Sequence, residues 1–89
     1  MTQETGMVVI SRMGRDKGRT FLITGRADGE RVYICDGELR KAQKPKLKKL
    51  KHLAFTGKKV EGLEKELERN TADAFIRKAI SALADSDKA

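Results

Sequence analysis

Short apolar runs separated by glycine-containing turns fill the first half of the chain. The β-branched run at residues 7–10 predicts one strand, and residues 19–24 and 30–35 predict two more. Asp28-Gly29 and Asp36-Gly37 precede and follow the third run, and Asp-Gly is a strong signal for a tight hairpin turn. Alternation within each run places part of its apolar side chains on one shared face. The residues expected to supply most of the core are Val8, Ile10, Phe21, Ile23, Val32 and Ile34.

The middle of the chain is expected to complete the sheet. Residues 39–42 predict a short fourth strand, and Lys44-Pro45 interrupts any regular element. Residues 47–55 fit two patterns, because the leucines have helical spacing whereas the last three residues alternate as on a strand. A barrel needs a closing strand at this point, so we favour a strand from Leu50 to Phe55. Short antiparallel strands with this spacing indicate a small barrel or sandwich.

The last third of the chain is predicted to be helical. Residues 63–67 indicate a short helix, and Ala72–Leu83 a longer one. An isolated helix of this length is marginal in water, so its apolar stripe must be covered by the strands or by a partner. The stripe consists of Ala72, Phe75, Ile76, Ala79, Ile80 and Leu83. We therefore expect a mostly β unit at residues 1–57 and a helical extension at residues 58–89.

The net charge of +7 is concentrated in one segment. Residues 1–38 carry equal numbers of basic and acidic side chains, and residues 60–89 carry a small acidic excess. Residues 39–59 carry nine basic side chains and no acidic one. Such a segment repels itself unless a polyanion neutralises it, and nucleic acid is the commonest polyanion in a cell. The alternative is a solvated surface that serves solubility, which does not require the exclusion of every acid.

A basic loop bracketed by glycines follows the first predicted strand. Residues 14–19 read Gly-Arg-Asp-Lys-Gly-Arg. The two glycines allow positive φ angles and a close approach of backbone N–H groups to a phosphate. The basic side chains add positive charge at the same place, and arginine can hold a phosphate through two N–H groups. An ordinary turn with solvated charges is the alternative interpretation.

This stretch resembles the KOW motif, in which a hydrophobic strand, here residues 8–13, runs into a Gly-Lys-Asp-Lys-Gly-Lys loop. Over residues 6–57 the chain is similar to the ribosomal proteins L14e and L27e and their small bacterial relatives. Cys35-Asp36-Gly37 and Lys51-His52-Leu53, with Thr56, resemble further elements of those proteins. Many KOW sequences have another glycine where this chain has Phe21. The resemblance implies an SH3-like barrel of five strands whose first loop touches RNA.

The basic segment and the loop together predict a surface for structured RNA. Aromatic residues make up only 4% of the chain, and recognition of unpaired strands relies on aromatic rings that stack on bases. Contacts to the backbone of folded RNA are therefore expected. The resemblance to KOW proteins implies ribosomal RNA as the main partner, with ribosomal proteins as further ones. Gly14 and Gly18 are expected to form the loop. The residues expected to contact RNA are Arg15, Lys17, Arg19, Arg40, Lys41, Lys44, Lys46, Lys48, Lys49, Lys51 and His52.

The residues give less support to other functions. His52 is the only histidine and Cys35 the only cysteine, so neither a standard catalytic triad nor a Cys/His metal site can be built within the chain. We therefore expect no enzyme activity, metal, cofactor or small-molecule substrate. No apolar run of about 18 residues and no signal-peptide pattern is present, so we expect a cytoplasmic protein without a membrane span. The alternative function is a protein-interaction module of SH3-like fold, whose binding would depend far less on salt.

Overall fold

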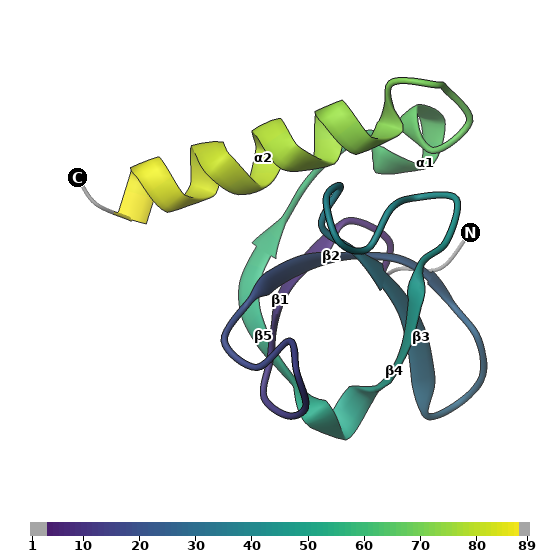
Figure 1. Ribbon diagram of the computed structural model, residues 1–89, viewed down its shortest axis with the longest axis vertical. Coiled ribbons are helices and arrows are strands. Elements are labelled where there is room, and N and C mark those ends of the chain that lie inside the picture. Colours follow the sequence, from purple (N-terminus) through teal and green to yellow (C-terminus); the bar gives the residue numbers. More distant parts are fainter. Residues whose placement is uncertain (1–3, 88–89) are drawn as a thin grey trace.

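The computed structural model describes residues 4–87 and consists of an antiparallel sheet of five strands followed by two helices (Figure 1). The strands lie in the order β4-β3-β2-β1-β5. The expected mostly β chain with C-terminal helices is therefore confirmed. The elements are β1 (Met7–Ser11), β2 (Thr20–Arg26), β3 (Arg31–Cys35), β4 (Lys46–Lys49), the 3-10 turn η1 (Leu50–His52), β5 (Leu53–Lys59), α1 (Leu63–Glu66) and α2 (Ala72–Asp87).

The sheet is strongly curved, and its two edge strands are consecutive in the chain. β1 lies between β2 and β5, so that Val9 is opposite both Phe21 and Phe55. η1 connects β4 to β5 at the lower end of the curved sheet in Figure 1. Within residues 4–87 no strand pairing joins β4 to β5. The sheet thus has a concave face enclosed by its own strands and a convex outer face.

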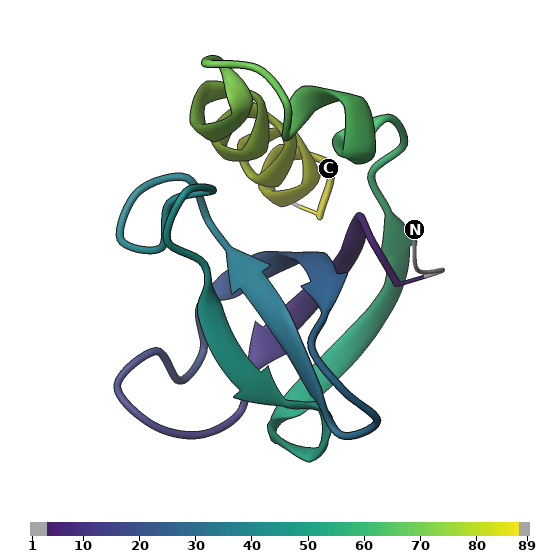
Figure 2. The same ribbon diagram turned by 90° about the vertical axis from the view of Figure 1, so that its right-hand side faces the viewer.

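Each face of the sheet has its own apolar cluster. The concave cluster contains Val9, Phe21, Ile23, Val32, Ile34 and Leu53. The outer cluster lies between the sheet and the helices and contains Val8, Leu22, Cys35, Leu63 and Ile76. Figure 2 shows α2 lying across the outer face of the sheet. Phe75, Ile80 and Leu83 pack against the outer cluster, so the predicted apolar stripe of α2 is covered by the sheet.

The core prediction was right for β2 and β3 and wrong in phase for β1. Val9, which was not among the expected core residues, is fully buried on the concave face. Val8 is buried on the opposite face, beneath the helices, and Ile10 is only half-buried. The run has apolar side chains on both faces because both faces of β1 are covered. Such a continuous run does not indicate which residues point inward.

The fourth strand lies later in the chain than predicted. Residues 39–42 form a turn, and β4 begins directly after Pro45. β4 is an edge strand, where a preceding proline removes no ladder hydrogen bond and lysines discourage pairing with other chains. The predicted closing strand also starts later, because Leu50 and His52 lie in η1 and β5 runs from Leu53 to Lys59. The β unit therefore extends past residue 57.

A polar seam attaches α2 to the connection between β3 and β4. The carboxylate of Asp73 accepts a hydrogen bond of 2.8 Å from the amide of Ala42. The guanidinium of Arg77 donates one of 2.6 Å to the carbonyl oxygen of Gly37. Gly37 has a φ of 80°, and a β-carbon there would lie 2.4 Å from the carbonyl oxygen of Asp73. Only glycine allows the helix to approach this closely. None of the helices in the described part of the chain combines the length and apolar character that crossing a membrane requires.

Candidate nucleic-acid interface

The glycine-bracketed loop is a compact turn held by its own backbone. Gly14 and Gly18 have φ angles of 83° and 86°, so both adopt the positive φ that their sequence positions predicted. The amide of Gly18 donates to the carbonyl of Ser11 over 2.8 Å, and the amide of Lys17 donates to Gly14 over 3.2 Å. These two amides therefore serve the loop itself, and the exposed side chains of Arg15 and Lys17 remain as its groups for an anion.

Asp16, the one acid of the loop, is buried and binds two cations, Arg40 in the connection between β3 and β4 and Lys46 at the start of β4. Its Oδ2 accepts hydrogen bonds from Nε and Nη2 of Arg40, at 3.1 and 3.0 Å, and from Nζ of Lys46 at 3.2 Å. Burial by itself would raise the pKa of Asp16, but the hydrogen bonds and charges of Lys46 and Arg40 outweigh it and lower the pKa below 3.8. The carboxylate is thus charged and fixes the loop against β4.

Lys48 supports the same loop from the inside. It lies opposite Val32 on the concave face of the sheet, and only 9% of the residue is exposed. Its Nζ donates a hydrogen bond of 2.8 Å to the carbonyl oxygen of Met13. The aliphatic stem is buried while the ammonium satisfies a backbone carbonyl, which is a common arrangement for lysine. Lys48 is therefore a structural residue of the loop, and its charge does not face an incoming phosphate.

A second buried carboxylate, that of Asp36, organises the turn after β3. Its Oδ1 accepts hydrogen bonds of 2.9 Å from the amides of both Glu38 and Arg40. Its Oδ2 accepts one of 2.9 Å from Nη2 of Arg19 at the end of the glycine loop. Burial alone would raise the pKa of Asp36, but these three hydrogen bonds lower it overall. Two buried acids thus tie the glycine loop to the connection formed by residues 36–45.

The predicted contact residues divide by what their charged groups already bind. Four are engaged within the protein, namely Arg19, Arg40, Lys46 and Lys48. Six are exposed and form no ion pair within residues 4–87, namely Arg15, Lys17, Lys41, Lys44, Lys49 and Lys51. Arg12 is also exposed, although it was not among the predicted contact residues. Its position between the first strand and the glycine loop is the feature of the sequence that could have indicated it. The acid-free segment is therefore partly neutralised by Asp16, which lies outside it.

The exposed cations lie on neighbouring loops. The glycine loop and the connection 36–45 project from the same side of the sheet (Figure 2), and the ion pair of Asp16 with Arg40 joins them. The amide of Arg12 donates a hydrogen bond of 2.8 Å to the carbonyl of His52, which places η1 beside the start of the glycine loop. We call the exposed cations of these two loops the basic surface, and its members are Arg12, Arg15, Lys17, Lys41 and Lys44.

His52 differs from the lysines around it. Its side chain is half-buried, and its pKa is lowered from 6.5, first by burial and then by the charges of Lys51, Lys48 and Lys49. The lowered pKa favours the neutral imidazole, which can exchange a hydrogen bond with a phosphate but adds no charge. His52 therefore stays a predicted RNA contact only as a hydrogen-bonding group and not as a cation.

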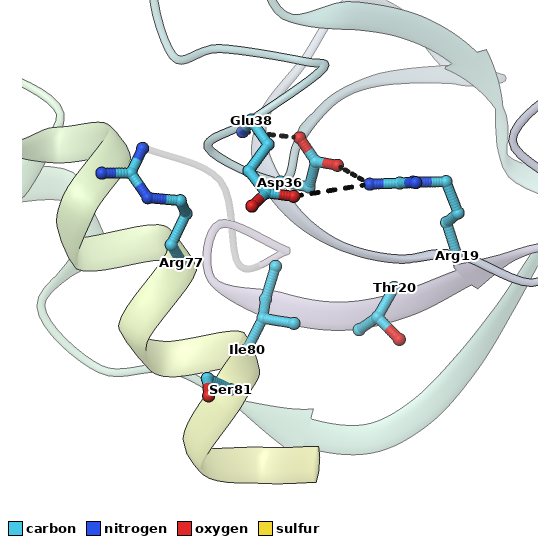
Figure 3. Close-up of a pocket in the computed structure, with 7 residues that line it drawn as sticks. All are labelled: Arg19, Thr20, Asp36, Glu38, Arg77, Ile80 and Ser81. Atoms are coloured by element: carbon cyan, nitrogen blue, oxygen red, sulfur yellow. Dashed lines mark hydrogen bonds and ion pairs between the residues drawn. The ribbon is translucent and has the colours of Figure 1, made fainter.

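The cleft between the glycine loop and α2 carries balanced charges. It has a volume of about 370 Å³ and is lined by residues of β2, the turn after β3 and α2 (Figure 3). Arg19 faces Asp36 at 2.9 Å and Glu38 at 3.8 Å across it. Arg77, from the helix, donates to the carbonyl of Gly37. Since both of its cations already have acceptors, this cleft offers an anion less than the basic surface does.

The described residues provide little for other chemistry. Cys35 is buried in the outer cluster, and burial raises the pKa of its thiol to about 12. Its Sγ donates to the carbonyl of Lys41. Among residues 4–87 no group of three or more His, Cys, Asp or Glu side chains is arranged to hold a metal ion. Comparison with models of protein families found no match, and comparison with curated proteins found none either.

Proposed function

We propose that the protein binds structured RNA, ribosomal RNA in particular, through contacts of the basic surface with phosphates. The observation that carries the proposal is the distribution of charge on the two joined loops. Their buried carboxylates, Asp16 and Asp36, form ion pairs with basic side chains of the protein itself. In contrast, five cations on the same loops are exposed and have no ion pair within residues 4–87. Such a field attracts a polyanion.

The loops are also prepared for binding before a partner arrives. Internal hydrogen bonds fix the glycine loop, and Lys48 and Asp16 hold it against β4. A fixed scaffold lowers the ordering cost of binding, which favours a surface of constant shape such as a folded RNA backbone. A protein partner is the second candidate for this surface. It is favoured by the exposed apolar side chain of Leu39, at the tip of the turn after β3.

The finer architecture belongs to the same proposal. β4 and β5 are adjacent in the chain, joined by η1, and form the two edges of a curved sheet, as in an SH3-like barrel with one open seam. The positive φ angles of Gly14 and Gly18 suit the glycine loop of the KOW motif. Both features support the resemblance to KOW proteins, in which this loop touches RNA.

Salt dependence is the decisive experiment. Affinity for a fluorescently labelled RNA hairpin is measured by anisotropy between about 50 and 200 mM salt. If about five phosphates are neutralised, the plot of log affinity against log salt has a slope of about −3.5 to −4.5, a loss of two to three decades over this range. An affinity that stays flat would refute the phosphate mechanism and favour the protein partner.

Matched variants that each remove positive charge locate the contact. Arg15→Gln with Lys17→Gln is expected to flatten the slope by about one to two units, because two phosphate contacts are lost. The control is Lys65→Gln with Lys78→Gln, which removes the same charge from exposed positions on α1 and α2, outside the two loops. Lys48→Met is expected to leave the slope unchanged, since the Lys48 ammonium is already bound inside the protein. Equal flattening by the two double variants, with about half as much from Lys48→Met, would show that only net charge matters.

A further inference from the structure

The outer face of β3 is covered by a helix at one end and bare at the other. Tyr33 and Cys35 both point to this outer face, because side chains alternate along a strand. Cys35 is fully buried in the outer cluster beneath α2, whereas 38% of Tyr33 is exposed. Tyr33 is the only tyrosine of the chain, and it belongs to neither apolar cluster. α2 therefore leaves the ring of Tyr33 available to a partner.

The neighbours of Tyr33 on this face leave its ring open toward β2. On β4 the residue opposite is Leu47, of which 40% is exposed. On β2 the residue opposite is Gly25, and a β-carbon placed there would have no atom within 4 Å. The ring thus does not lie over Gly25, and open space remains on that side. Tyr33 and Leu47 form a small apolar shelf on an otherwise polar surface.

Positive charge adjoins this shelf at one end. Lys49 follows Leu47 on the same face of β4 and is exposed, and Lys51 lies just beyond it in η1. Neither forms an ion pair in the described part of the chain. Between them and the β2–β3 turn is a cavity of about 320 Å³ lined by Gly29, Glu30, Lys49, Leu50 and Lys51. Arg31, opposite Lys49, is held by Asp28.

We propose that Tyr33 and Leu47 bind one unpaired RNA base, with Lys49 and Lys51 on the phosphates next to it. This inference rests on the proposed function, because it assigns to the same RNA a second contact of a different kind. An exposed aromatic ring with lysines beside it fits a nucleotide, whose base is flat and apolar on its faces and whose phosphate is anionic. The single carboxylate at the cavity, Glu30, faces two lysines and leaves the site positive.

The chain contains its own reporter for this contact. Since it has one tyrosine and no tryptophan, its intrinsic fluorescence comes from Tyr33. A base stacked on the ring is expected to quench that fluorescence. The protein is titrated with single-stranded hexaadenylate, with a six-residue abasic ribose-phosphate chain of the same charge, and with a fully paired RNA hairpin. Quenching is expected with hexaadenylate and not with the other two.

Affinity measurements on variants complete the test. Tyr33→Leu keeps an apolar side chain but removes the ring, and it is expected to weaken binding of labelled hexaadenylate about tenfold, the effect of losing one base–aromatic stack. Tyr33→Phe keeps the ring and is expected to bind within about twofold of the unaltered protein. Both variants are expected to bind the paired hairpin unchanged.

The outcomes separate this inference from the proposed function. If Tyr33 fluorescence is unchanged by hexaadenylate while the hairpin binds with a steep salt dependence, the base site is refuted and phosphate binding stands. If quenching occurs equally with the abasic chain, the ring responds to phosphates alone and the base site is again refuted. If no RNA binds, both proposals fail. A fluorescence change produced by proteins but by no RNA would assign the shelf to a protein partner and refute the base site.

Discussion

Asp16 and Arg40 are 24 residues apart in the chain, and the carboxylate of one lies 3.0 Å from the guanidinium of the other. This pair joins the glycine loop to the connection 36–45, which α2 in turn holds through Arg77 and Gly37. Contacts thus run without interruption from the C-terminal helix to the loop proposed to bind RNA. The helix, which carries none of the proposed contacts, therefore contributes to the shape of the binding surface.

Replacing Asp16 with asparagine is expected to lower the free energy of unfolding by about 1–3 kcal/mol, because a buried charged acceptor of three hydrogen bonds is lost. Urea denaturation followed by circular dichroism measures the change. Asp28→Asn is the matched control, since Asp28 pairs with Arg31 at an exposed hairpin and should matter much less. An Asp16 variant no less stable than the control would contradict a structural role for this carboxylate.

Acid is expected to destabilise the protein through the same carboxylates. The pKa values of Asp16 and Asp36 are lowered below 3.8 in the folded state, whereas the unfolded chain has ordinary values. Their contribution to stability is therefore complete above about pH 5 and is lost as the pH falls through the folded-state pKa values. Urea midpoints measured between about pH 2.5 and 7 should fall steeply at the acid end, and less steeply in Asp16→Asn. Identical profiles would exclude Asp16 as a source of the acid sensitivity.

Two glycines provide a matched test of the seam beneath α2. Gly18 and Gly37 both have positive φ angles, of 86° and 80°. An alanine at Gly18 meets no atom within 4 Å, so Gly18→Ala should cost only the backbone strain of about 1–2 kcal/mol. At Gly37 the new methyl group would also collide with the carbonyl of Asp73, so Gly37→Ala should cost clearly more. Equal losses in thermal denaturation would mean that α2 moves away without cost.

The phase of β1 and β3 is tested by two isoleucines. Ile34 is fully buried on the concave face, so Ile34→Ala is expected to cost about 2–5 kcal/mol. Ile10 is half-buried beside Ile80 and Leu83 at a small cleft under α2, and Ile10→Ala should cost about 1–2 kcal/mol. Denaturant melts of both variants measure the difference. A larger loss at Ile10 would place the concave core differently from the arrangement described.

Local sequence patterns located α2 and gave the inward phase of β2 and β3, although Leu22 and Cys35 are buried on the outer face of those strands as well. Phe21, Ile23, Val32 and Ile34 alternate with polar or outward residues, and the apolar stripe of α2 has helical spacing, so these elements could be predicted. In β1 both faces are covered and the alternation disappears, which is why Val9 was missed. The paired glycines also predicted positive φ at the loop, because few other residues adopt it without strain.

The candidate site was harder to predict, because its charges are decided by tertiary contacts. No local signal distinguishes Lys48, which is buried, from Lys49, which is exposed, since both stand in the same run of lysines. Their difference arises from pairing with β3, which directs Lys48 inward opposite Val32. The first residue of β4, Lys46, is likewise bound by Asp16, a partner 30 residues earlier in the chain. Charge counts along the chain cannot contain this information.

The central position of β1 has a consequence for how the protein folds. β1 is among the first segments of the chain, yet its second neighbour is β5, and their pairing joins Met7 to Lys59. A long loop must close before this pairing forms, and folding slows as contacts become more distant in sequence. Until residues 53–59 have been synthesised and have docked, β1 presents an unpaired edge. The nascent chain therefore remains open to wrong pairing with other strands until β5 docks.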